Sequence, residues 1–152
     1  MNLDPARSIA ALSSRWRNRF SRSKKLPEHL RRGVRGEKLA SRFLRNHGYK
    51  ILYRNFRDRR GGEIDIVCRD DDTLVFVEVK TRSDEDFGRP IEAVDRRKQL
   101  RVSKGGLAWL RFLDNPDIVF RFDVVEVLLP DDGDPHFELI QNAFELSQPY
   151  IY

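Results

Sequence analysis

Two adjacent extended segments, at residues 62–69 and 73–81, constrain the fold of this chain more than any other feature. The second, TLVFVEVK, is an almost continuous apolar run, which is typical of a strand buried on both faces. The first, EIDIV, alternates acids with isoleucines, as a strand with one polar face does. The acidic turn RDDD joins the two. They predict neighbouring strands inside a sheet that nevertheless carries acids and a lysine.

Two helices are expected around this pair of strands. Pro27 suits the first turn of a helix, and an apolar stripe with an Asn/Gly stop predicts that helix over residues 28–47. A second helical stretch covers residues 91–113, from Ile91 to about Leu113. Gly105 and Gly106 interrupt the second helix, and each should weaken or kink it by roughly 1 kcal/mol.

Three more strands are predicted by β-branched and aromatic runs, at residues 50–57, 118–129 and 137–144. The chain order is then one helix, three strands, one helix and two strands. This order predicts the α/β class, with a central mixed β-sheet flanked by helices. The helical connection before residue 118 is long enough for a parallel crossover.

Length and composition favour one globular domain in a reducing compartment. The chain has 152 residues, of which 39% are hydrophobic and 35% are charged. No apolar run approaches the roughly 18–20 residues that a membrane span requires. Cys68 is the only cysteine, which excludes an intrachain disulfide and a multi-cysteine zinc site and favours a cytoplasmic setting.

Basic charge is concentrated at the N-terminus. Residues 1–32 hold nine Lys or Arg against two acids, a net charge of +7, which leaves −2 of the total +5 for residues 33–152. We expect residues 1–27 to form a flexible basic extension and residues 28–152 to form the domain. A solubilising tail, a contact with nucleic acid or another polyanion, and a membrane-surface or targeting segment remain alternative roles for the extension.

Strand periodicity sorts the charged side chains by face. Glu78 and Lys80 share one face of their strand, about 6–7 Å apart along it. In the preceding strand, the two faces carry Ile64, Ile66 and Cys68 on one side and Glu63, Asp65 and Val67 on the other. If the polar faces of the two strands align, Asp65 lies close to Glu78. The alternatives are a solvated face for the first strand and a surface Glu–Lys pair at the end of the second.

Two neighbouring carboxylates repel each other, and burial makes ionising both more costly. A divalent cation resolves this conflict, and Mg²⁺ typically takes one or two carboxylates, a carbonyl and waters. A lysine beside the ion can stabilise the charge that develops on a phosphate or position the attacking water. Asp65, Glu78 and Lys80 on adjacent strands therefore suit the hydrolysis of a phosphodiester with Mg²⁺ or Mn²⁺.

Glu37 adds a fourth charged residue. It precedes Ala40 and Leu44 on the helix side expected to face the core, where an acid needs a partner or a metal. Gly33 and Gly36 flank it and allow backbone or ligand to approach closely. The alternative is that Glu37 reaches solvent near the start of the helix.

Other charged residues suit contacts with nucleic acid. Arg forms bidentate hydrogen bonds to phosphate, and Thr or Asn side chains also contact the backbone of DNA. The residues considered for this role are Arg54, Asn55, Arg57, Thr81, Arg82 and Lys98. Balancing nearby acids, capping a strand end and forming a solvated helix face are the respective alternatives. Inside the strand at 118–129, Arg121 and Asp123 share a face and predict a structural ion pair, while Cys68 is expected in the core.

The sequence resembles the PD-(D/E)xK nucleases, because Asp65 is followed thirteen residues later by Glu-x-Lys. More narrowly, it is identified as a member of the YraN family of small bacterial proteins. Six ordered blocks over about residues 33–128 carry this resemblance: RGEKLA, GYKILYRNFR, GGEIDIV, LVFVEVKTR, AVDRRKQLRV and RFDVVEV.

This resemblance implies a restriction-endonuclease-like fold, close to that of archaeal Holliday junction resolvases. It implies that Asp65, Glu78 and the Val79 carbonyl bind Mg²⁺, that Lys80 orients the water or stabilises the transition state, and that Glu37 completes the site. It further implies an endonuclease that cuts DNA, including branched or structured DNA, and a homodimer. The competing expectations are a non-catalytic nucleic-acid-binding module and a protein-interaction factor in DNA processing, each retaining the fold.

Overall fold

The computed structural model of the chain describes residues 27–83 and 94–150. The predicted basic extension, apart from Pro27, and the predicted start of the second helix at Ile91 lie outside these residues.

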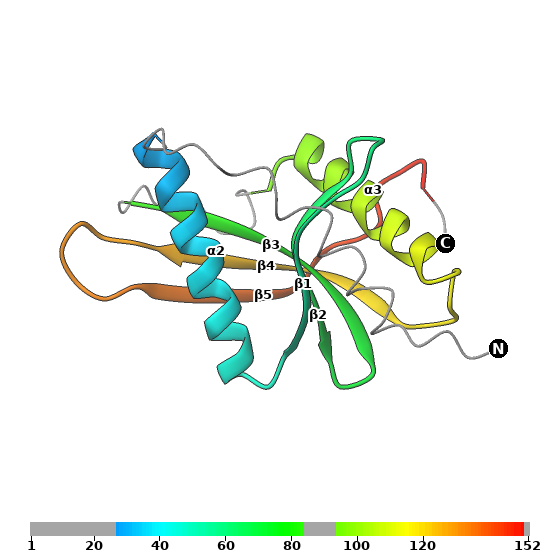
Figure 1. Cartoon of the computed structure of the whole chain (residues 1–152), viewed down its shortest axis with the longest axis horizontal. Coiled ribbons are helices and arrows are strands. Elements are labelled where there is room, and N and C mark those ends of the chain that lie inside the picture. Colours follow the sequence, from blue (N-terminus) through cyan, green and yellow to red (C-terminus); the bar gives the residue numbers. More distant parts are fainter. Residues whose placement is uncertain (1–26, 84–93, 151–152) are drawn as a thin grey trace, which may run out of the picture.

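Two helices and five strands make up the described fold (Figure 1). In chain order they are α2 (Glu28–Asn46), β1 (Lys50–Arg57), β2 (Glu63–Asp70), β3 (Thr73–Arg82), α3 (Arg96–Phe112), β4 (Phe120–Leu128) and β5 (His136–Phe144). The strands form one sheet in the order β1-β2-β3-β4-β5. Only β3 and β4 pair in parallel, and α3 connects them. The predicted mixed sheet, the parallel crossover and the final strand are therefore confirmed.

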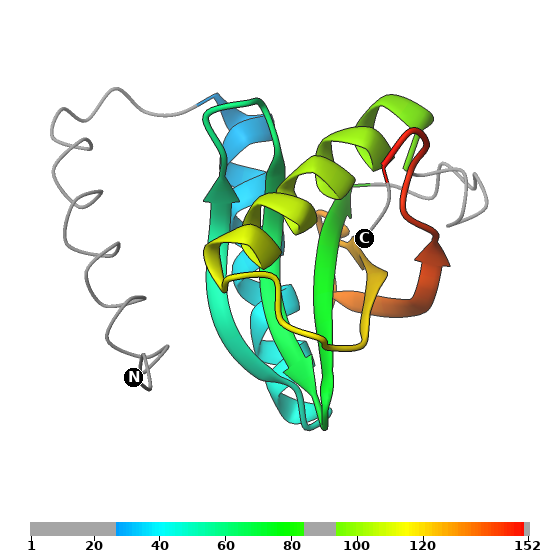
Figure 2. The same cartoon turned by 90° about the vertical axis from the view of Figure 1, so that its right-hand side faces the viewer.

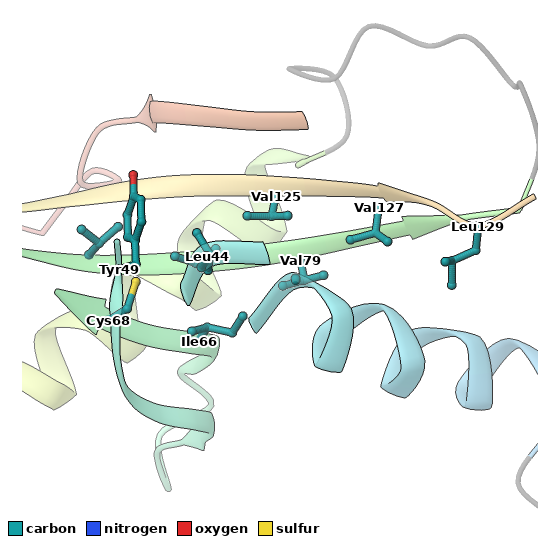
Figure 3. Close-up of a cluster of buried hydrophobic side chains, with 11 residues drawn as sticks. Leu44, Tyr49, Ile66, Cys68, Val79, Val125, Val127 and Leu129 are labelled. Carbon is teal, nitrogen blue, oxygen red and sulfur yellow. The ribbon is translucent and has the colours of Figure 1, made fainter. Parts of the chain in front are cut away.

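The helices cover opposite faces of the sheet (Figure 2). Beneath α2, Ala40 and Leu44 pack on a cluster of mostly aliphatic side chains from β2, β3 and β4 (Figure 3). Beneath α3, Trp109 and Leu110 pack on a more aromatic cluster that includes Phe76. Because β3 is buried between both layers, its apolar run has no polar face except where Glu78 lies.

Helix α3 departs from its prediction in two ways. It begins at Arg96 because the Asp95 side chain caps it, accepting the Lys98 backbone N–H at 2.8 Å. Moreover, the helix continues through Gly105 and Gly106, so the expected interruption is wrong. A Cβ on Gly105 would lie 2.8 Å from Ile64 Cγ1, so a glycine is needed for α3 to approach β2 this closely.

The predicted faces of β2 are also wrong in part. Ile66 and Cys68 share one face as expected, the face under α2, but Ile64 packs under α3. Regular alternation would keep Ile64 and Ile66 on one face. The strand therefore turns over at the residue between them, Asp65, and period-two counting fails at that point.

A polar network lies at the far end of the sheet from this irregularity. The predicted ion pair is confirmed, with Arg121 Nε 3.0 Å from Asp123 Oδ1. Arg121 also donates to Asp70 Oδ2 at 2.8 Å and to the Tyr49 hydroxyl at 3.0 Å. Cys68 is buried nearby, as predicted, and burial first, then the Asp123 charge, raises the pKa of its thiol to about 12. The network is structural, because its buried carboxylate is fully hydrogen-bonded.

Two glycines on α2 provide a matched pair for stability measurements. A Cβ on Gly36 would overlap Thr81 Oγ1, whereas a Cβ on Gly33 would meet nothing within 4 Å. We expect Gly33→Ala to raise the free energy of unfolding by up to about 1 kcal/mol, because alanine favours helix. We expect Gly36→Ala to lower it by about 1–3 kcal/mol through overpacking. Urea unfolding of both variants checks this, and equal shifts would contradict the described packing.

Neither described helix, α2 or α3, is long and apolar enough to cross a membrane.

Candidate active site

Asp65 lies where the regular pairing of β2 with β3 stops. The paired residues run from Asp70 and Thr73 to Ile66 and Val77. Beyond that point the Val79 N–H donates to Asp65 Oδ2 at 2.8 Å instead of to a backbone carbonyl. The Asp65 carboxylate therefore occupies the gap between the two strands, and this explains why β2 turns over there.

The backbone of Val79 faces the same gap. In a strand, the N–H and C=O groups of one residue project toward the same neighbouring strand. Since the Val79 N–H points to Asp65, its carbonyl points to the β2 side as well. The sequence expectation of a Val79 carbonyl beside Asp65 is consistent with this direction.

Glu78 is a buried acid, only 5% exposed, on the α3 side of β3. Its Oε1 atom lies 3.2 Å from Lys98 Nζ. Its Oε2 atom is buried and has no hydrogen-bond donor among the described residues. Burial first, and then the negative charge of Asp65, raise the pKa of Glu78 to about 8. A proton or a cation between Glu78 and Asp65 would satisfy both carboxylates.

Lys98 enters the site from α3. Its Nζ donates to Glu63 Oε1 at 2.6 Å, and Arg101 binds the other oxygen of Glu63 at 2.7 Å. Burial opposes the charge on Lys98, but Glu78 and the other nearby acids outweigh it and raise its pKa. A solvated helix face is therefore the wrong description of Lys98, and a solvated strand face is the wrong description of Glu63.

Opposing effects act on Glu63 itself. Burial favours its neutral form, but the hydrogen bond and charge of Lys98, with the charges of Arg101 and Arg57, outweigh burial. Together they hold the pKa of Glu63 below its usual value. Glu63 is thus an anionic anchor for Lys98 in the neutral pH range.

Lys80 follows Glu78 on the same face of β3. It is half-buried, and its register partner on the parallel strand β4 is Glu126. Lys80 forms no ion pair with any residue in the described part of the chain. Within the described residues, therefore, no acid competes with an anionic ligand for its ammonium group.

Glu37 approaches the site from α2. Burial and the charge of Asp65 raise the pKa of its half-buried carboxyl, against a hydrogen bond from Asn55 and the charges of Arg54 and Arg57. The structure therefore brings Glu37 and three of the predicted nucleic-acid contacts to the Asp65 end of the sheet.

Asn55 is placed by the pairing of β1 with β2. Arg54 pairs with Ile66 and Phe56 with Ile64, so Asn55 lies directly across from Asp65. Its φ of 55° is in the left-handed region, where Asn is one of the better tolerated residues. Strand β1 is thus irregular directly across from the irregular residue of β2. The Asn55 side chain lies close enough to Glu37 to donate a hydrogen bond to it.

Thr81 and Arg82 end β3 on the far side of the carboxylates. Thr81 packs directly against Gly36 of α2. Arg82 Nε lies 3.0 Å from Glu126 Oε1, an ion pair that the sequence did not predict. Both residues nevertheless border the site.

A metal would have to be held here by few protein ligands. No three His, Cys, Asp or Glu side chains in residues 27–83 and 94–150 form a group that could hold a metal ion. Asp65, the buried and donor-free Oε2 of Glu78, and a carbonyl on the same side offer two carboxylates and one neutral oxygen. Mg²⁺ commonly binds to such a set and keeps several waters, so the residues fit this ion.

Sequence patterns did not predict that Glu63 binds both Lys98 and Arg101. One signal was present: Lys98 and Arg101 are three residues apart and therefore share one side of a helix. Glu63 is also two residues from Asp65 in the same strand. The missing information was the position of α3 over β2.

Comparison with known proteins gives one family. The profile of the uncharacterised protein family UPF0102 matches residues 36–127, which contain the whole carboxylate cluster. A UPF0102 protein of Geobacter sulfurreducens is 50% identical over 115 residues, covering 76% of this chain and 89% of the relative. One from Pelobacter propionicus is 49% identical over 123 residues, covering 80% and 87%. One from Syntrophus aciditrophicus is 46% identical over 123 residues, covering 81% and 95%.

Proposed function

The chain belongs to the uncharacterised protein family UPF0102, which is the YraN family, and from this premise we propose that it is a metal-dependent endonuclease that hydrolyses phosphodiester bonds in DNA. One observation carries the proposal. Asp65, at the gap between β2 and β3, lies close enough to buried Glu78 to raise its pKa, one oxygen of Glu78 has no donor among the described residues, and Lys80 follows on the same strand.

Each residue has a role in this proposal. Asp65, Glu78 and the Val79 carbonyl hold Mg²⁺ or Mn²⁺, which when bound polarises the phosphate and acidifies a water. Lys80 orients the attacking water or neutralises charge on the phosphate, as its lack of a described ion pair allows. Glu37 lies on the α2 side, where its raised pKa suits a group that accepts or passes a proton.

The proposed substrate is DNA, including branched or structured DNA. Arg54 and Arg57 are exposed beside Glu37 and supply positive charge where a DNA backbone would approach. By analogy with resolvases we also propose a homodimer, since two active sites suit two strands. The single, buried Cys68 is compatible with work in the cytoplasm.

The direct test is cleavage by the purified protein. Linear, flapped and four-way-junction DNA are incubated with Mg²⁺, with Mn²⁺ and with a chelator. We expect cutting only when metal is present. Binding without cutting on every substrate would support a non-catalytic module instead. That second function is favoured by one observation: Lys98 forms ion pairs with both Glu63 and Glu78, and Arg101 forms one with Glu63.

Lys80→Ala distinguishes the two functions further. We expect the cleavage rate to fall by about 100-fold or more, because one charge-stabilising group at the phosphate is lost. DNA affinity measured without divalent metal should change little, since only one contact is removed. Lys50→Ala is the matched control. It removes the same charge from the exposed start of β1, which pairs with Arg69 at the end of β2 away from Asp65. Equal activity of both variants would remove Lys80 from the mechanism.

A further inference from the structure

A cleft of about 540 Å³ opens between the first turns of α2 and the end of β3. Its described lining includes three basic side chains, His29, Arg32 and Arg82. It also includes Glu37 and Val79, which belong to the candidate active site. The cleft is therefore continuous with the carboxylate cluster.

A missing side chain creates the hollow. Gly33 lines the cleft, and a Cβ there would meet nothing within 4 Å. One turn further along α2, Gly36 is packed tightly against Thr81, so the helix cannot move closer and fill the space. A side chain at position 33 would enter the cleft without displacing the fold.

The charges in the cleft suit an anion. Arg32 lies 3.3 Å from Asp131 and 3.7 Å from Glu28, but both acids are largely exposed, with side chains 79% and 78% accessible. Ion pairs of this kind contribute little and exchange readily for another anion. Arg82 is held at 3.0 Å by Glu126, which fixes its position beside the cleft.

The geometry points to a nucleotide subsite: we infer that this cleft takes the nucleotide next to the cut phosphate, with Arg32 exchanging Asp131 for that nucleotide's phosphate. The inference rests on the proposed function, because the cleft borders the proposed metal site. A phosphate inside a strand and a terminal phosphate have the same recognition chemistry. Both are therefore included in the test.

Gly33→Leu tests the subsite by filling it. A short fluorescein-labelled single strand, with and without a 5′-phosphate, is titrated with protein in the absence of divalent metal, and anisotropy is measured. We expect at least about 10-fold weaker binding, since the new side chain would exclude the nucleotide from the cleft. Val34→Leu on the neighbouring exposed position, 57% accessible, should bind as wild type does. Thermal unfolding should show Gly33→Leu folded and no less stable.

Arg32→Ala supplies a second measurement that does not depend on filling the cleft. The slope of log affinity against log salt concentration should become shallower by about one. A loss for both oligonucleotides supports an internal phosphate, and a loss only for the phosphorylated one supports a strand end. Wild-type affinity and an unchanged salt slope in both variants would overturn the inference, as would a wild type that binds neither strand.

The outcomes also separate this inference from the proposed function. A wild type that never cuts, but loses binding on Gly33→Leu, would refute the nuclease and leave the subsite in place. A wild type that cuts, with Gly33→Leu binding and cutting equally well, would refute only the subsite.

Discussion

Asp65→Asn is expected to abolish metal-dependent DNA cleavage, lowering the rate by about 1,000-fold or more. The substitution removes the charge that pairs with Glu78 around the proposed ion, and the ion contributes several kcal/mol to charge stabilisation. The amide oxygen of asparagine can still accept the Val79 N–H, so the sheet should keep its local structure. Thermal unfolding should therefore change little while activity disappears.

Two readouts and one control make this result interpretable. Isothermal titration with Mg²⁺ should show that binding is lost together with cleavage. Asp71→Asn, in the exposed turn between β2 and β3, makes the same chemical change without touching the site. Its φ of 47° is well tolerated by asparagine. Cleavage by Asp65→Asn at the rate of Asp71→Asn would rule out the proposed metal site.

The second large effect concerns Glu78 and stability. Its pKa is raised from 4.5 to about 8 in the folded protein, because burial and Asp65 disfavour its charged form. The folded state therefore binds this proton more tightly than the unfolded state does. The stability that this tighter proton binding gives the folded state is fully present below about pH 4.5 and is lost as the pH rises to about 8. Above that range the wild type carries a penalty on the order of several kcal/mol.

Glu78→Gln should remove this penalty. We expect the variant to be more stable than wild type at pH 9 and similar to it at pH 5, as measured by urea unfolding. Mg²⁺ should stabilise wild type at pH 9 through binding to the folded state, and should not stabilise Glu78→Gln. Glu138→Gln, on an exposed position of β5, is the matched control. Parallel pH curves for wild type and Glu78→Gln would show that the pKa of Glu78 is not raised in the folded protein.

Local patterns predicted most of the sheet, because each strand is a short apolar or alternating run between turn residues. The predicted strand at residues 50–57 coincides with β1. The proximity of Asp65 and Glu78 was also predictable, since a tight turn between two strands leaves few alternatives for their register. Contacts between the two strands of one hairpin can therefore be inferred from residues that are close in the sequence.

Contacts between distant segments were not predictable in the same way. Periodicity predicts that Lys98 shares a helix side with Arg101, but not that this side lies over Glu63, 35 residues earlier. Ile64 was assigned to the wrong face because alternation assumes a regular strand and Asp65 interrupts it. Gly105 suggests a weak helix when it is considered alone, and its close contact with β2 appears only in the packed structure.

The hydrogen bond from Val79 to Asp65 gives the protein an internal reporter of its own site. A carboxylate that closes a gap in a sheet protects one amide from exchange with solvent deuterium. When Asp65 turns toward a cation or a phosphate, that protection should weaken at Val79, while neighbouring amides within the regular ladder keep theirs. Occupancy of the site would therefore be recorded in the exchange rate of a single backbone proton, without any label, substrate or cleavage product.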